Sequence, residues 1–476
     1  MLKIEAVDDI KQFVYSIDQY SDEEIYKNFN KILLFRTKHE YYVSAKHMTI
    51  FLIKRIKDLG LKEKLIRKYY VFPDRCVSWV HVMASISNLS EEEQIKLLGN
   101  LISNQAFAEV GSTLDIPENL KFGLELEYGN LSYCDLQMLF ENGQIKTIMR
   151  TLGIPKNIIS ELCNNSVFPD EKISDYSKWV FTKELEDVDP EISTPVLHND
   201  LDSLNKVKAV SLLFKALKAM MHSSTGLHIN VGVDYLGYNI ETIKFLLKIW
   251  AECEEIFFKI ANEKGVTIRD SVDVMAEPMK AQIQKAFDCN LNFDFTVNES
   301  LAWFIYNIQV RDRLEDVLSA NKFSDLRYEA RYNARNSRER FGIFLRYLET
   351  KTKYESKERF TCINFNHMNW GRSDSDRIEF RLFNNSLNFD TITEDLLLVG
   401  KLFKTCFELA NGNGKMDKFS ALLDCNVTEE QKLELLLDLL FDNEEEKAIF
   451  RERWESVKDN SKYDQFYTGR RTFVRI

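Results

Sequence analysis

The chain has 476 residues, 45% of them hydrophobic, and this length exceeds what one hydrophobic core usually supports. We therefore expect a globular protein with two or three domains. The formal net charge of -11 argues against a surface made for nucleic acid or for anionic membranes, so we expect neither as a partner.

The first residues and the cysteines indicate the cellular compartment of the protein. Acidic side chains follow the initial Met1-Leu2 where a signal peptide needs an apolar stretch, and no apolar run approaches the roughly twenty residues of a membrane-spanning helix. The eight cysteines are widely spaced and include no C-x-x-C pair, which favours neither a disulfide framework nor a cysteine zinc site. We expect a cytoplasmic protein.

The first hundred residues or so have a helical pattern. Residues 21–24 (SDEE) and 90–93 (SEEE) are capping boxes, in which a serine hydroxyl accepts from a helix amide and a later glutamate reaches back. Turn-forming residues over 111–119 then mark a boundary. The basic stretch 54–68 fits solvated helix faces or a surface that docks an acidic partner. We expect residues 1–115 to form a helical domain that selects the substrate or a protein partner.

Beyond this boundary, short strand-like segments alternate polar and apolar residues. They are 122–128 (FGLELEY), 191–195 (EISTP), 226–231 (GLHINV) and 377–382 (RIEFRL). Side chains alternate faces along a strand, so polar residues two apart share a face. The pairs are Glu125 with Glu127, His228 with Asn230, and Glu379 with Arg381. We expect carboxylate, imidazole and guanidinium groups to line one surface.

Helical patterns return later in the chain. The clearest helix runs from about Asn239 to Gly265, with apolar residues at helical spacing. A third capping box at residues 428–431 opens a leucine-rich segment. We expect a central domain over residues 116–400 and a helical C-terminal segment over residues 401–476 that packs on it.

The sequence lacks several familiar motifs. No G-x-x-x-x-G-K-[ST] or G-x-G-x-x-G occurs, which weighs against P-loop and Rossmann nucleotide sites. No H-E-x-x-H or G-x-S-x-G occurs, so zincin and serine-hydrolase chemistry also lose support.

The remaining polar residues predict a cation site. The set comprises four glutamates and one histidine: Glu125, Glu127, Glu191, Glu379 and His228. Oxygen-rich ligand sets suit hard divalent cations, here magnesium or manganese, better than zinc or copper. Four ionised glutamates in one cavity repel one another unless cations or arginines neutralise them, and Arg377 and Arg381 lie beside Glu379 in the sequence.

Each feature taken alone also fits an ordinary structural role. Glu125 and Glu127 match a solvent-facing strand surface, and Glu379 with Arg381 matches the charged face of an edge strand. His228 alone matches a hydrogen-bonded core or surface histidine. Only the combination of these segments favours a site.

The strand at residues 122–128 resembles the opening strand of the carboxylate-amine ligase superfamily, which includes glutamine synthetase and gamma-glutamylcysteine ligase. Within that superfamily the chain is most similar to the amidoligases. Further motifs follow in the family's order, namely Trp179 before 191–195, then 225–232, 363–365 and 377–383. The resemblance covers about residues 120 to 400.

The resemblance implies an α+β fold: a glutamine synthetase-like curved antiparallel sheet with backing helices, with ATP and Mg2+ or Mn2+ on its concave face. It implies five metal ligands, which are Glu125, Glu127, Glu191, His228 and Glu379. Arg377 and Arg381 are implied to contact phosphate and to act in catalysis.

Two positions depart from the family's pattern. Asn230 stands where glutamine synthetase has the second histidine of its H-x-H motif, and we group it with the two arginines as a nucleotide-binding candidate. Where relatives have an aspartate shortly after the tryptophan, this chain has Thr182, Lys183 and Glu184. Glu184 is the candidate general base that takes a proton from the incoming amine.

The implied function is an ATP-dependent carboxylate-amine ligase. Transfer of the ATP γ-phosphoryl group to a carboxylate forms an acyl phosphate, and attack by an amine then forms an amide or isopeptide bond. We expect small-molecule or peptide carboxylates and amines as substrates. Two alternatives stay open: a kinase of the same superfold that phosphorylates a guanidino or carboxylate group, and a non-catalytic binding or scaffold protein on a degenerate ligase fold.

Overall fold

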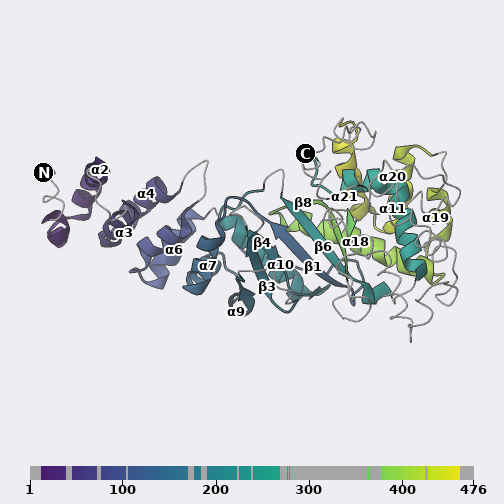
Figure 1. Ribbon diagram of the computed structural model, residues 1–476, viewed down its shortest axis with the longest axis horizontal. Helices are drawn as coiled ribbons and strands as arrows, with labels where there is room; N and C mark the ends of the chain where they lie inside the picture. The colour runs from purple at the N-terminus through teal and green to yellow at the C-terminus, as the bar shows by residue number, and fades with distance from the viewer. Residues whose placement is uncertain are drawn as a thin grey trace, which may run out of the picture.

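The protein combines helices with one mixed sheet, which confirms the expected α+β class (Figure 1). None of the described helices combines the length and the apolar character needed to cross a membrane. The structure is a computed structural model that describes residues 12–38, 45–71, 77–102, 106–169, 176–183, 190–221, 225–236, 240–267, 276, 278, 362–364, 377–423 and 427–460.

The N-terminal helices form an arm that extends from the sheet along the long axis of the molecule (Figure 1). The arm contains η1 (Ile17–Gln19), α2 (Asp22–Lys38), α3 (Ala45–Arg55), α4 (Leu59–Tyr70), α5 (Trp79–Ile86) and α6 (Glu91–Leu101). Two predicted capping boxes are confirmed. Ser90 accepts from the Glu93 amide while the Glu93 carboxylate accepts from the Ser90 amide, and Ser21 and Glu24 make the same reciprocal pair.

The arm packs directly on the helices that follow it. These helices are α7 (Tyr133–Glu141), α8 (Gln144–Thr151) and α9 (Lys156–Asn165). Helix α6 packs on α8, and α5 packs on α7. The Trp79 indole donates to the Leu217 carbonyl over 2.8 Å, and the Phe107 amide donates to the Leu152 carbonyl over 2.7 Å. Contacts therefore cross the predicted boundary near residue 115.

One sheet lies at the centre of the molecule (Figure 1). Its strands are β1 (Lys121–Glu127), β2 (Ser166–Val167), β3 (Trp179–Lys183), β4 (Pro190–Ser193), β5 (Leu197–His198), β6 (Gly226–Gly232), β7 (Ile363–Asn364) and β8 (Arg377–Asn384). The order is β2-β3-β4-β1-β6-β8-β7, and β5 pairs with the start of β1. The described pairings are antiparallel except for β2 with β3, which run parallel. The antiparallel expectation thus holds for the central strands and is wrong at this edge.

Helices cover the apolar face of the sheet. They include α10 (Leu201–Ala216), α11 (Ile240–Ile260) and α18 (Phe389–Ala410), and the short η2 (Val233–Leu236) links β6 to α11. Phe380 of β8 contacts Trp250 of α11 and Phe403 of α18, each with ring centroids 5.8 Å apart. Tyr128, which directly follows β1, stacks on Phe214 of α10. The aromatic residues of this face therefore fix the helices against the sheet, and the other face is left for polar groups.

Helix α11 ends earlier than predicted. It stops at Ile260 rather than at Gly265. Gly265 instead has a φ of 79° and lies in the turn beyond, where the Val266 amide donates to the Glu263 carbonyl. The glycine thus closes a separate turn, because its conformation is available to glycine at no steric cost.

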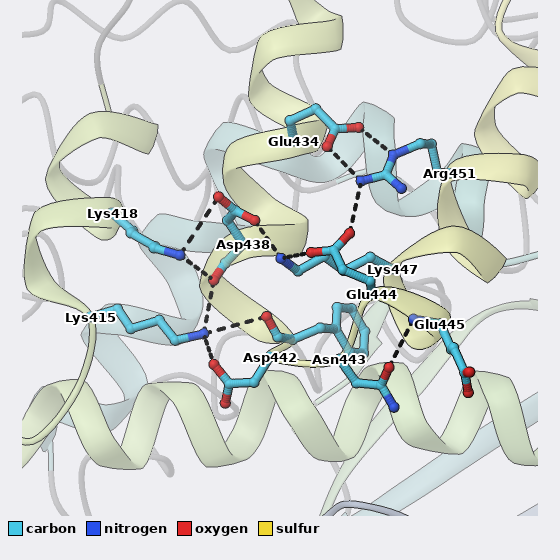
Figure 2. A network of polar contacts seen from close by, with 11 residues as sticks. Lys415, Lys418, Glu434, Asp438, Asp442, Asn443, Glu444, Glu445, Lys447 and Arg451 are labelled. Carbon is cyan, nitrogen blue, oxygen red and sulfur yellow. Dashed lines mark hydrogen bonds and ion pairs between the residues drawn. The ribbon is translucent and has the colours of Figure 1, made fainter.

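The C-terminal helices α19 (Met416–Leu422), α20 (Glu429–Leu440) and α21 (Glu444–Val457) pack on α11 and α18. Helix α18 runs through residue 400, the predicted boundary of the C-terminal segment. The third capping box is confirmed by the reciprocal bonds of Thr428 and Gln431. Figure 2 shows a charged network between these helices, in which Lys447 reaches Asp438 and Glu444 over 2.6 Å and 2.7 Å.

Candidate metal centre

The strand registers bring the predicted polar residues to one face of the sheet. Glu125 of β1 lies directly opposite His228 of β6, and Glu127 lies opposite Glu191 of β4. Further along β6, Asn230 lies opposite Glu379 of β8. Directly opposed residues on neighbouring strands point to the same face. Segments that are far apart in the sequence therefore place their side chains side by side.

Glu125, His228 and Glu379 form a buried triad at the centre of this face. The His228 Nδ1 atom lies 3.3 Å from Glu125 Oε2 and 3.3 Å from Glu379 Oε1. One ligand atom from each residue lies within 4.8 Å of the others. The Glu379 side chain is 0% exposed, and that of Glu125 is 10% exposed. Two carboxylates and one imidazole thus converge where little water reaches them.

Glu127 and Glu191 form a second acidic pair beside the triad. They are directly opposed across β1 and β4, and both are buried. Glu127 Oε1 lies 3.5 Å from His228 Nε2, so the imidazole has two carboxylates beside Nδ1 and a third beside Nε2. The Gly226 amide donates to Glu127 Oε2 over 2.6 Å, and Ser193 Oγ donates to Glu191 Oε1 over 3.4 Å. Like charges directly opposed on neighbouring strands are destabilising, so this pair favours a bound cation.

The two predicted arginines take different positions. Arg381 reaches the triad, where its guanidinium donates to Glu379 Oε1 over 2.6 Å. Arg377 is only half-buried, and its guanidinium stacks on the Tyr176 ring at 4.7 Å from the centroid. Its Nε donates to Asn230 Oδ1 over 2.8 Å. The arginines thus supply one positive charge inside the centre and one at its edge.

Asn230 connects the edge of the centre to the triad. Its Oδ1 accepts from Arg377, and its Nδ2 donates to Glu125 Oε1 over 3.2 Å. Both polar atoms of the side chain therefore contact protein groups. Glu184, the expected general base, lies outside the described residues.

A β-bulge beside His228 was missed by the sequence pattern. Leu227 pairs with Phe383 and Ile229 with Phe380, so β8 has one extra residue opposite His228. Strict alternation from Glu379 would place Phe383 on the polar face, and the bulge returns it to the apolar face. The adjacent apolar residues Leu382 and Phe383 were the available signal, because they break the alternation.

Asn364 of β7 was also missed as a site residue. It lies directly opposite Glu379 and is 2% exposed. Its Nδ2 donates to Glu379 Oε2 over 2.7 Å. The sequence offered it only as part of the motif at residues 363–365, because an asparagine before a phenylalanine carries no chemical signature of its own.

The donor chemistry of this face fits a hard divalent cation. Oxygen donors predominate, and one imidazole joins them. Among the described residues of the face, the four carboxylates of the triad and of the acidic pair outnumber the two guanidinium groups. Bound positive charge would favour the ionised form of buried carboxylates in such number. No protein-family model, curated protein or solved structure matches this chain.

The acidic pair allows a prediction about stability without metal. Glu127→Gln keeps an oxygen acceptor for the Gly226 amide but removes the repulsion with Glu191. We expect the metal-free variant to unfold at a higher temperature, with a gain of up to about 1 kcal/mol. Calorimetry in EDTA and in excess MnCl2 measures this gain. In excess Mn2+ the wild type should be the more stable of the two proteins, because a cation that binds only the folded protein stabilises the wild type more.

Glu191→Gln serves as the matched control for that experiment. Each single substitution removes the same repulsion, so the double variant should gain little beyond either one. A metal-free Glu127→Gln protein that is less stable than the wild type would contradict the repulsion.

Proposed function

We propose that the protein is an ATP-dependent carboxylate-amine ligase that requires Mg2+ or Mn2+. The observation that carries the proposal is the buried triad of Glu125, His228 and Glu379, with an arginine from the same strand as Glu379 bound to it. An acidic pair on the same face supports a second cation. Several carboxylates near arginines are the groups needed to hold a nucleotide's phosphates through cations.

The proposed roles follow from the positions of the side chains. Glu125, His228 and Glu379 would hold one cation, and Glu127 with Glu191 a second. Bound there, such cations would supply the positive charge that phosphate oxygens need during phosphoryl transfer to a carboxylate. The Gly226 amide fixes the Glu127 carboxylate, which limits the reorganisation needed when charge develops.

The arginines would bind the phosphate chain. A guanidinium presents several donors in a planar fork that matches phosphate oxygens. Stacking on Tyr176 holds the Arg377 guanidinium at the edge of the centre, in position for an anion arriving there. Arg381 lies deeper, on Glu379, and would share its charge between that carboxylate and the transferring phosphoryl group.

The first test is nucleotide binding. We expect the purified full chain to bind a non-hydrolysable ATP analogue with MgCl2 present and not with EDTA, as measured by calorimetry. Arg381→Gln should weaken binding, because it removes a charge-assisted contact. Arg451→Gln, which alters a partly exposed arginine of α21, is the control and should bind normally. Absence of nucleotide binding by the wild type would refute the proposal.

The second test identifies the reaction. Incubation with ATP, Mg2+ and a metabolite or peptide extract should release ADP and inorganic phosphate and form an amide product that mass spectrometry detects. A phosphorylated product without an amide would contradict the ligase and indicate a kinase. Nucleotide binding without any product from a broad extract would favour the non-catalytic alternative.

A further inference from the structure

Asn364 and Arg381 each donate a hydrogen bond to one of the two oxygens of the buried Glu379 carboxylate. The Asn364 amide donates to Oε2 over 2.7 Å, and the Arg381 guanidinium donates to Oε1 over 2.6 Å. These residues come from adjacent strands, β7 and β8. A carboxylate with a donor on each oxygen has its plane fixed, so its rotation about the terminal bond is restricted.

The orientation that results directs one oxygen to the triad. Glu379 Oε1 lies 3.3 Å from His228 Nδ1, while Oε2 lies on the side of Asn364. Exchange of the two oxygens would require breaking both hydrogen bonds. Asn364 lies on the opposite strand directly across from Glu379, so the backbone ladder fixes its distance. The Asn364 Nδ2 atom donates to Glu379, a candidate ligand, so the side chain acts on the orientation of that carboxylate.

We propose that Asn364 is a positioning residue that orients Glu379 for cation binding, an inference that rests on the proposed metal centre. Partners that hold metal ligands in place are typically worth ten- to a hundredfold in metal affinity. Asn364 acts on the cation of the triad and leaves the Glu127 and Glu191 pair unaffected. Its effect is therefore specific to one of two cations.

The test measures Mn2+ binding to the full chain by calorimetry. Asn364→Leu keeps the side-chain size but removes the donor to Glu379. We expect the substitution to lower the affinity for the triad cation about ten- to a hundredfold and to leave the affinity for the second cation unchanged. Asn262→Leu is the matched control, because Asn262 is equally buried at 2% exposure, donates to the Phe258 carbonyl and accepts from the amide of Asn384, at the end of β8, without contacting Glu379. This control should bind Mn2+ as the wild type does.

A double-mutant cycle separates positioning from general loosening. Asn364→Leu should lower the Mn2+ affinity much less in a Glu379→Gln background than in the wild type. In a Glu127→Gln background, its effect on the Mn2+ affinity should simply add to that of the first substitution. Unchanged Mn2+ binding by Asn364→Leu would overturn the proposal and leave the proposed function intact. An equal loss at both cations would also overturn it. Normal Mn2+ binding by the wild type without nucleotide binding would refute the ligase and leave the positioning role in place.

Discussion

Glu379→Gln should abolish cation-dependent turnover and lower the affinity for Mn2+ by more than about a hundredfold. This loss exceeds the one typical of removing a residue that only hydrogen-bonds to a metal ligand. The Glu379 side chain is 0% exposed and lies 3.3 Å from His228 Nδ1, at the centre of the triad. Glutamine has the same shape but presents a neutral amide, so the cation loses a charged ligand. Calorimetry with MnCl2 measures the binding, and ADP release measures the turnover.

The fold should survive this substitution. The glutamine oxygen can still accept from Arg381, and a turn of the Asn364 amide presents its oxygen to the new NH2 group, so both polar atoms keep a partner. Glu254→Gln is the matched control, because Glu254 is also 0% exposed but lies on α11, across the sheet, where it accepts from the Trp250 indole over 2.9 Å. The control should bind Mn2+ normally. Near-normal turnover by Glu379→Gln would exclude this residue from the site.

Arg453→Met should destabilise the protein by about 3–5 kcal/mol, the usual cost of removing one partner from a buried ion pair. Arg453 of α21 is 2% exposed and donates to Asp395 of α18 over 2.6 Å, where Asp395 is 0% exposed. The guanidinium also donates to the Ile260 carbonyl at the end of α11 over 3.1 Å and to Glu394. One side chain therefore connects three helices, and its loss leaves a buried carboxylate without a counter-charge.

The variant's stability should depend on pH. Burial raises the pKa of the Asp395 carboxyl to about 7, although the Arg453 guanidinium acts in the opposite direction. Without that arginine the folded-state pKa rises further above its unfolded value, so folding takes up a proton between pH 4 and at least 7. Both proteins lose stability as pH rises from about 4 to about 7, and the variant continues to lose it above pH 7 because its Asp395 stays protonated to higher pH. Urea unfolding of both proteins should show that the variant falls further below the wild type in free energy of unfolding at pH 8 than at pH 5.

Two further variants control this experiment. Arg451→Met, two residues away on the same helix, breaks a partly exposed pair with Glu434 that Figure 2 shows and should cost less than about 1 kcal/mol. Arg453→Met combined with Asp395→Leu should recover most of the lost stability, because no unpaired charge stays buried. A double variant as unstable as the single one would contradict the assigned cause.

Local signals in the sequence were sufficient for several features. The three capping boxes mark the starts of α2, α6 and α20, because each is a contact within four residues. Alternation along β1, β6 and β8 predicted which side chains share a face, since the period of two is a property of the strand itself. The mixture of strands and helices beyond residue 115 follows from the same two periodicities.

Tertiary structure decided the features that depend on distant segments. Which strands are neighbours, and hence that Glu379 meets His228 and Asn364, is set by backbone hydrogen bonds between segments far apart in the chain. The bulge opposite His228 returns Phe383 to the buried apolar face, and alternation along one strand cannot place it. The sequence alone therefore determined the candidate ligands, whereas strand order and register, which arise from non-local pairing, determined how those ligands meet.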